Sequence, residues 1–215
     1  MVSRRMIGIV DCGTGNMWSV QTAFEYLGAT VRLVDDPRLL TECSHIVLPG
    51  VGSFRLAMKA LIERGMADAI RREAENGKQM MGICLGMQLM ARNSTEDCAS
   101  GETTEGLGLI DAVVRKFDTT SNAALKIPHV GFNTVVVEES CGLFESFGRT
   151  ADFYFTHSYR LIPDGVNCNS AICEHGEIFL AAFDAGNVCG TQFHPEKSQS
   201  NGLLIMKNFL DKAEC

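Results

Sequence analysis

A cysteine between two glycines is the first feature of this sequence that could do chemistry. The segment Gly82-Ile83-Cys84-Leu85-Gly86 has the G-x-nucleophile-x-G form of an elbow between a strand and a helix, with cysteine in place of serine. Glycines two positions away on each side let strand and helix approach closely, and a thiol at the start of a helix is favoured as the thiolate. Taken alone, the pentapeptide fits an ordinary buried cysteine equally well, because free cysteines commonly lie in protein cores.

A histidine and a glutamate near the C-terminus could activate such a nucleophile. They lie in the segment Gln192-Phe193-His194-Pro195-Glu196-Lys197-Ser198. Because His194 and Glu196 are two positions apart, an extended chain places them on the same face. A carboxylate bound to one imidazole nitrogen leaves the other facing the thiol. Alone, the pair is better explained as solvated residues at a strand end, but together with the elbow it predicts a Cys-His-Glu triad.

A glycine-rich turn supplies the third chemical signal, in the segment Leu48-Pro49-Gly50-Val51-Gly52-Ser53-Phe54. The two glycines allow the backbone to turn its N–H groups towards a ligand. Hydrolysis of an amide passes through an oxyanion that needs two such donors, and we expect them from Val51 and Leu85, with Gly52 beside them. Ser53 also suits the N-cap of a following helix, and both interpretations can hold at once.

Other kinds of site are poorly supported by the sequence. Gly13 and Gly15 resemble the start of a dinucleotide fingerprint, but Trp18 occupies the third glycine position. The spacing of histidines, cysteines and acids matches neither a metal site nor a paired-carboxylate site, and we expect no metal and no cofactor. The net charge of -7 argues weakly against nucleic acid or an anionic membrane as a partner.

The cysteine content predicts a reducing, cytoplasmic setting. Nine cysteines are an odd number in a chain too long to need disulfides for stability, and no secretory signal precedes them. No apolar run approaches the roughly 20 residues that would span a bilayer.

The elements that must position these groups alternate between short apolar strands and amphipathic helices. Expected strands in the first half are 6–10, 30–34, 45–48 and 79–83, and expected helices are 16–27, 54–62, 66–75 and 85–91. This alternation predicts an α/β fold: a doubly wound, mostly parallel sheet with helices on both faces. Sites in such sheets form at the carboxyl ends of the strands, which brings the loops after Val10, Leu48 and Ile83 together.

The second half of the chain is richer in strands and predicts an antiparallel extension of the sheet. Expected strands are 112–117, 134–137, 152–156, 170–173, 178–183 and 187–192, followed by a helix over 201–211. No linker or repeat interrupts the chain, and we expect residues 1–215 to form a single domain.

Taken together and in this order, the three segments resemble the class I glutamine amidotransferases. The resemblance covers nearly the whole chain and extends to the glutaminase subunits of imidazole glycerol phosphate synthase. Further segments that carry it are 9–16, 19–20, 104–110, 127–133 and 154–159.

The resemblance implies a fold and a set of roles. The fold is that of a glutamine amidotransferase type 1 domain, and the activity is the release of ammonia from glutamine. Cys84 would be acylated by the glutamine amide, His194 would move the proton and Glu196 would orient the imidazole. The residues implied to hold glutamine are Gln88, Ser158 and Tyr159.

The resemblance also implies a partner. Ammonia would pass to a cyclase subunit shaped as a (β/α)₈ barrel, in a heterodimer that serves histidine synthesis. Residues implied to lie near the interface are Asn16, Pro128, His129, Phe132 and Lys197. We further hypothesise that the isolated chain is a poor glutaminase, because the flexible peptide before Gly52 could turn its carbonyl towards the oxyanion until a substrate-loaded partner docks.

Some positions depart from the family pattern, and several of these lie where the partner should dock. Cys12 stands where the family often has Tyr, Thr14 where Met is usual, and Val130 and Phe132 where Met and Trp are usual. An alternative function is therefore the supply of ammonia for amidated sugars of surface polysaccharides.

Two hypotheses of other kinds fit less well. Cysteine hydrolases and peptidases on similar sheets usually carry His directly after the nucleophile, where this chain has Leu85. A non-catalytic binding subunit would not need Cys84, His194 and Glu196 together.

Overall fold

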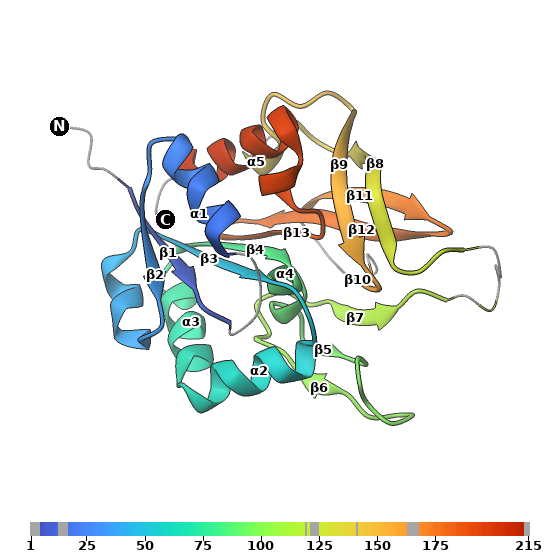
Figure 1. Ribbon diagram of the computed structural model, residues 1–215, viewed down its shortest axis with the longest axis horizontal. Coiled ribbons are helices and arrows are strands. Elements are labelled where there is room, and N and C mark those ends of the chain that lie inside the picture. The colour runs from blue at the N-terminus through green and yellow to red at the C-terminus, as the bar shows by residue number, and fades with distance from the viewer. Residues whose placement is uncertain are drawn as a thin grey trace.

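One mixed β-sheet runs through the middle of the protein (Figure 1). The computed structural model describes residues 5–12, 17–118, 120, 125–140, 142–162 and 168–212. Across these residues the sheet has 13 strands, in the order β2-β1-β3-β4-β13-β12-β10-β7-β5-β6, with β11, β8 and β9 branching from β12. The predicted α/β fold with an antiparallel extension is confirmed, although the extension is larger than the sequence suggested.

Five parallel strands form the half of the sheet that carries the predicted chemistry. In spatial order they are β2 (Thr30–Val34), β1 (Met6–Val10), β3 (His45–Gly50), β4 (Gln79–Cys84) and β13 (Val188–Thr191). Every residue of β3 and β4 is buried, as expected for parallel strands covered on both faces. The predicted strand ranges agree to within two residues at each end.

Helices pack against both faces of this parallel half (Figure 1). One face is covered by α1 (Met17–Tyr26) and α5 (Gln199–Asp211). The other is covered by α2 (Phe54–Glu63), α3 (Met66–Glu75) and α4 (Leu85–Leu89). A hydrophobic core lies on each face of the sheet, and neighbouring residues of β4 point into different cores. Met80 packs in the core under α2 and α3, and Met81 packs in the core under α1 and α5. None of the described helices has the length and apolar character needed to cross a membrane.

The helix after the elbow is shorter than predicted. It ends at Leu89 rather than at Ala91, because the loop around Leu107 takes over its last carbonyls. Leu107 N donates to Leu89 O at 2.7 Å, and Leu109 N donates to Met90 O at 2.8 Å. A tertiary contact therefore ends a helix that the local sequence would continue.

The other half of the sheet is mainly antiparallel, and six of its strands follow β6 along the chain. They are β7 (Val113–Lys116), β8 (His129–Val137), β9 (Thr150–His157), β10 (Tyr159–Leu161), β11 (Asn169–His175) and β12 (Glu177–Ala185). The predicted strand 134–137 starts five residues earlier, at His129, because β8 pairs with β9 along its whole length. β10, β5 (Asn93–Ser94) and β6 (Thr104–Glu105) were not predicted, being too short to show alternation.

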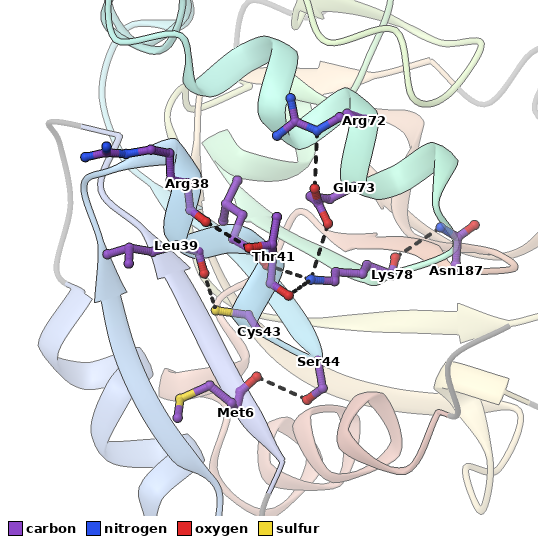
Figure 2. A network of polar contacts seen from close by, with 11 residues as sticks. Met6, Arg38, Leu39, Thr41, Cys43, Ser44, Arg72, Glu73, Lys78 and Asn187 are labelled. Carbon is purple, nitrogen blue, oxygen red and sulfur yellow. Dashed lines mark hydrogen bonds and ion pairs between the residues drawn. The ribbon is translucent and has the colours of Figure 1, made fainter.

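Three 3₁₀ helices also lay outside the sequence predictions: η1 (Pro37–Glu42), η2 (Gly142–Phe144) and η3 (Pro195–Lys197). A lysine holds the first of them to the sheet (Figure 2). The amine of Lys78 donates to the carbonyls of Leu40 and Thr41 at 2.7 Å each and pairs with buried Glu73 at 3.2 Å. The carbonyl of Leu40 also accepts from Cys43 N at 3.2 Å, so Lys78 adds to the backbone bond that closes the end of η1.

Candidate active site

Three adjacent parallel strands bring the chemical segments together. In the register of the sheet, Gly50 of β3 lies opposite Cys84 of β4, and Thr191 of β13 lies opposite Ile83. The elbow, the glycine-rich turn and the His-Glu segment therefore leave the sheet at the same edge. This is the carboxyl edge predicted from the sequence.

The backbone at Cys84 has the strained conformation that the elbow motif predicts. Its φ is 54° and its ψ is −107°, a region that residues with a side chain rarely occupy. A Cβ atom on Gly82 would lie 2.6 Å from Met87 Cα, and one on Gly86 would lie 1.6 Å from Leu48 O. Both glycines are therefore required for strand β4 and helix α4 to pack around the turn.

His194 and Glu196 form a buried pair beside this turn. His194 Nδ1 lies 2.8 Å from Glu196 Oε1, and both side chains are less than 5% exposed. Burial lowers the pKa of His194, but attraction to Cys84 and Glu196 outweighs it and raises the pKa to about 9. At neutral pH the imidazole is therefore the cation, paired with the Glu196 carboxylate.

The other imidazole nitrogen, Nε2, is the one available for proton transfer. It is buried and makes no hydrogen bond of ordinary geometry with the residues that the structure describes. The sulfur of Cys84 has two polar neighbours besides the imidazole: Gln192 Nε2 at 3.6 Å and the carbonyl of Thr156 at 3.9 Å.

A cavity of about 350 Å³ opens in front of Cys84. Its walls include the predicted glutamine-holding residues Gln88, Ser158 and Tyr159, and the predicted oxyanion residues Val51, Gly52 and Leu85. Gly52 has a φ of 111°, which a residue other than glycine would adopt only with strain. A larger hollow of about 770 Å³ lies over α2, but it contains none of the three triad residues.

Two residues of the site, Glu96 and Gln192, have no sequence signal of their own. Glu96 follows β5 and also lines the cavity, and its carboxylate accepts a hydrogen bond from Phe54 N at 2.8 Å. Burial raises the pKa of Glu96, although this hydrogen bond opposes the shift. Gln192 lies within the His-Glu segment, but its buried amide meets the nucleophile only in the folded protein.

The residues predicted to face a partner lie in different environments. Phe132 is 53% exposed on β8, and Pro128 and Lys197 are also exposed. The side chain of His129, in contrast, is buried. Asn16 and Thr14 lie outside the described residues.

The buried side chain of His129 belongs to a chain of hydrogen bonds. His157 Nδ1 lies 2.8 Å from the carbonyl of Tyr159, so this nitrogen carries the proton. His157 Nε2 then accepts from His129 Nδ1 at 3.0 Å, and His129 Nε2 accepts from Asn133 at 3.2 Å. Burial lowers the pKa of His157 to about 3 and of His129 to about 4, so both rings are neutral at neutral pH.

Comparisons with known proteins agree with this geometry. The family model for class I glutamine amidotransferases matches residues 8–213. The subunit HisH of imidazole glycerol phosphate synthase from Syntrophotalea carbinolica is 40% identical over 96% of this chain and 100% of its own length. A longer relative from Arabidopsis thaliana, the chloroplastic imidazole glycerol phosphate synthase hisHF, is 36% identical over 97% of this chain but only 34% of its own length. The structure of PurLQS from Thermotoga maritima superimposes with a TM-score of 0.73 at 21% identity, covering 97% of this chain and 99% of that one.

The protein is therefore a class I glutamine amidotransferase, an enzyme class with glutaminase activity. Within this class the chain belongs to the family of HisH subunits of imidazole glycerol phosphate synthase. The chain belongs to that family despite the departures at Cys12, Val130 and Phe132. Its membership favours the supply of ammonia for histidine synthesis over the supply of ammonia for polysaccharide sugars.

Proposed function

We propose that this chain, as one domain spanning residues 1–215, hydrolyses glutamine at Cys84 and passes the ammonia to a cyclase subunit in the synthesis of histidine. The observation that carries the proposal is the buried triad at the edge of the substrate cavity. His194 contacts Glu196 at 2.8 Å through Nδ1, which leaves Nε2 free for the Cys84 thiol, the other group that raises the pKa of the imidazole. We also expect this chain and its cyclase partner to work in the cytoplasm, where free cysteines are kept reduced.

The geometry supports a two-stage reaction. The Cys84 thiolate attacks the side-chain amide carbon of glutamine, and the carbonyl oxygen becomes an oxyanion held by the N–H groups of Val51 and Leu85. His194 Nε2 gives its proton to the amide nitrogen, the carbon–nitrogen bond breaks, and ammonia leaves a thioester on Cys84. A water molecule then loses a proton to His194 and attacks the thioester, which releases glutamate and restores the thiolate.

The walls of the cavity match the rest of the substrate. Glu96 is the only carboxylate that lines it among the described residues, and the α-ammonium group of glutamine needs such a partner. Gln88, Ser158 and Tyr159 lie along the same cavity and would hold the remaining polar groups.

Support for the partner comes from the surface and from one relative. Val130 is 58% and Phe132 is 53% exposed on β8, and exposed apolar side chains on one strand are typical of an interaction surface. The Arabidopsis relative named hisHF carries a region like this chain within a polypeptide about three times as long. A separate partner that forms a heterodimer with this chain would supply what that relative has in a single polypeptide.

The catalytic assignment is tested by replacing the nucleophile. We expect Cys84→Ala to abolish glutamate release while the circular dichroism spectrum stays unchanged. In the wild type, a diazo ketone analogue of glutamine should label Cys84 selectively, since burial raises the pKa of the Cys12 and Cys173 thiols to about 12. Hydrolysis by the Ala variant near the wild-type rate, or a label found mainly on another cysteine, would contradict the assignment.

A further inference from the structure

A buried glutamine lies next to the nucleophile and takes no part in the reaction steps given so far. Gln192 follows strand β13, two residues before His194, and its side chain is 0% exposed. Its Nε2 atom lies 3.6 Å from the sulfur of Cys84, which is a normal distance for a hydrogen bond to this large atom. The amide thus contacts a reacting atom from a side other than the imidazole.

The orientation of the Gln192 amide follows from its neighbours. Gln88 Nε2 lies 2.9 Å from the carbonyl of Tyr159, which can only accept, so this end of Gln88 is the NH₂ group. The same NH₂ group lies 2.8 Å from Gln192 Oε1, so this atom of Gln192 is the oxygen. The NH₂ group of Gln192 must then face the sulfur. The backbone carbonyl of Tyr159 thereby sets the direction of every hydrogen bond in this series.

A donor held in this direction favours one protonation state of the nucleophile. A hydrogen bond to an ionised acceptor is roughly twice as strong as one to a neutral acceptor, and burial strengthens the difference. The thiolate therefore gains more from the Gln192 N–H than the thiol does. Acylation of the sulfur removes its charge, so the bond is strongest before the attack.

We propose that Gln192 is a further catalytic residue of this site, whose amide N–H, oriented by Gln88 and the Tyr159 carbonyl, stabilises the Cys84 thiolate. The proposal rests on the proposed function, because it takes Cys84 as the nucleophile. It also gives Gln88 a second role besides lining the substrate cavity. The imidazolium of His194 and the amide of Gln192 would then share the charge of the sulfur.

The test measures the thiolate directly and does not require glutamine turnover. Iodoacetamide is added to the full-length protein at a series of pH values, and alkylation of the Cys84 peptide is followed by mass spectrometry. Gln192→Met keeps the size of the side chain and removes the donor. Loss of a hydrogen bond to a charged group should reduce the thiolate about tenfold, which moves the pH midpoint of alkylation up by about one unit.

A matched control and a second variant keep the test decisive. Gln79 is a buried glutamine at the opposite end of β4, and Gln79→Met should leave the midpoint unchanged. Gln192→Glu retains the shape and places a carboxylate oxygen against the sulfur, so its midpoint should rise further than that of Gln192→Met.

The proposal is overturned if a folded Gln192→Met or Gln192→Glu protein keeps the wild-type midpoint. It is equally overturned if Gln79→Met shifts the midpoint as much, because the effect would then come from the loss of any buried amide. Failure of the proposed function has a different signature, namely glutamate release that survives Cys84→Ala.

Discussion

At the scale of single residues, the chemistry depends on the different roles of Glu196 and His194. Glu196 holds Nδ1 of His194 at 2.8 Å, which leaves Nε2 for Cys84, the other side chain that raises the pKa of the imidazole. The carboxylate therefore orients the ring and stabilises its charge, whereas the ring itself moves the proton.

This division of tasks predicts unequal effects of substitution. His194→Ala should lower kcat by about 10²–10⁴-fold, the usual range for a lost general base. Glu196→Gln should cost less, because the amide oxygen can still accept from Nδ1 while only the negative charge is lost. Steady-state glutamate production in the presence of the partner measures both. Equal and total loss in the two variants, with unchanged circular dichroism, would count against the assigned roles.

At the scale of elements, the elbow depends on how closely β4, α4 and β3 pack. The carbonyl of Leu48 on β3 occupies the space where a side chain at position 86 would begin. The strained backbone at Cys84 can persist only because these elements leave it no alternative.

Gly86→Ala should therefore destabilise the fold as well as the site. A Cβ atom 1.6 Å from a backbone oxygen forces a backbone shift, and such overpacking costs about 3 kcal/mol or more at rigid positions. Urea unfolding measures the change in the free energy of unfolding. Gly148→Ala is the control, because a Cβ there meets nothing within 4 Å. Equal stability of the two variants would refute the packing argument.

A second element-scale prediction concerns pH. His45, at the start of β3, is buried against Phe209 of α5, and burial lowers its pKa from 6.5 to about 4. Below pH 6.5 the unfolded chain binds a proton here that the folded protein excludes until about pH 4. The stability that His45 contributes is therefore complete above pH 6.5 and is lost as the pH falls towards 4, at up to about 1.4 kcal/mol per pH unit.

His45→Gln should accordingly weaken the acid sensitivity of the protein. The free energy of unfolding in urea should fall less between pH 6.5 and 5 in the variant than in the wild type. The other titrating groups act in both proteins and cancel in the comparison. Parallel pH profiles would show that His45 does not exclude the proton.

At the scale of the whole molecule, the site lies next to the surface that we assign to the partner. Val51 lines the substrate cavity, and it also lines a smaller cavity that includes His194 and Lys197. The peptide expected to donate to the oxyanion thus reaches from the reacting centre to the neighbourhood of an exposed lysine.

This arrangement predicts that the partner controls the activity. If the Val51 peptide turns its carbonyl inward in the isolated chain, one oxyanion donor is missing, which costs about 10²–10³ in rate. Glutamate production should be low for the isolated chain and rise by that factor with the partner and its own substrate. Full turnover by the isolated chain would reject this control and leave the triad assignment intact.

The sequence by itself determined the parallel half of the fold from local patterns, and it predicted the triad from the combination of two local segments. Continuous apolar strands, the glycines around Cys84 and the spacing of His194 and Glu196 each have a direct physical meaning along the chain. The antiparallel strand β10 and the early start of β8 did not follow from it, since short strands take their shape from their neighbours.

Only the tertiary structure decided which further side chains meet the reacting atoms. Gln192 contacts the sulfur because β13 and β4 are adjacent in parallel register, and Glu96 lines the cavity because its loop folds onto the start of α2. His129 was predicted near the partner interface, and the pairing of β8 with β9 places its side chain against His157. Such contacts join residues far apart in the chain, and no local pattern of residues encodes them.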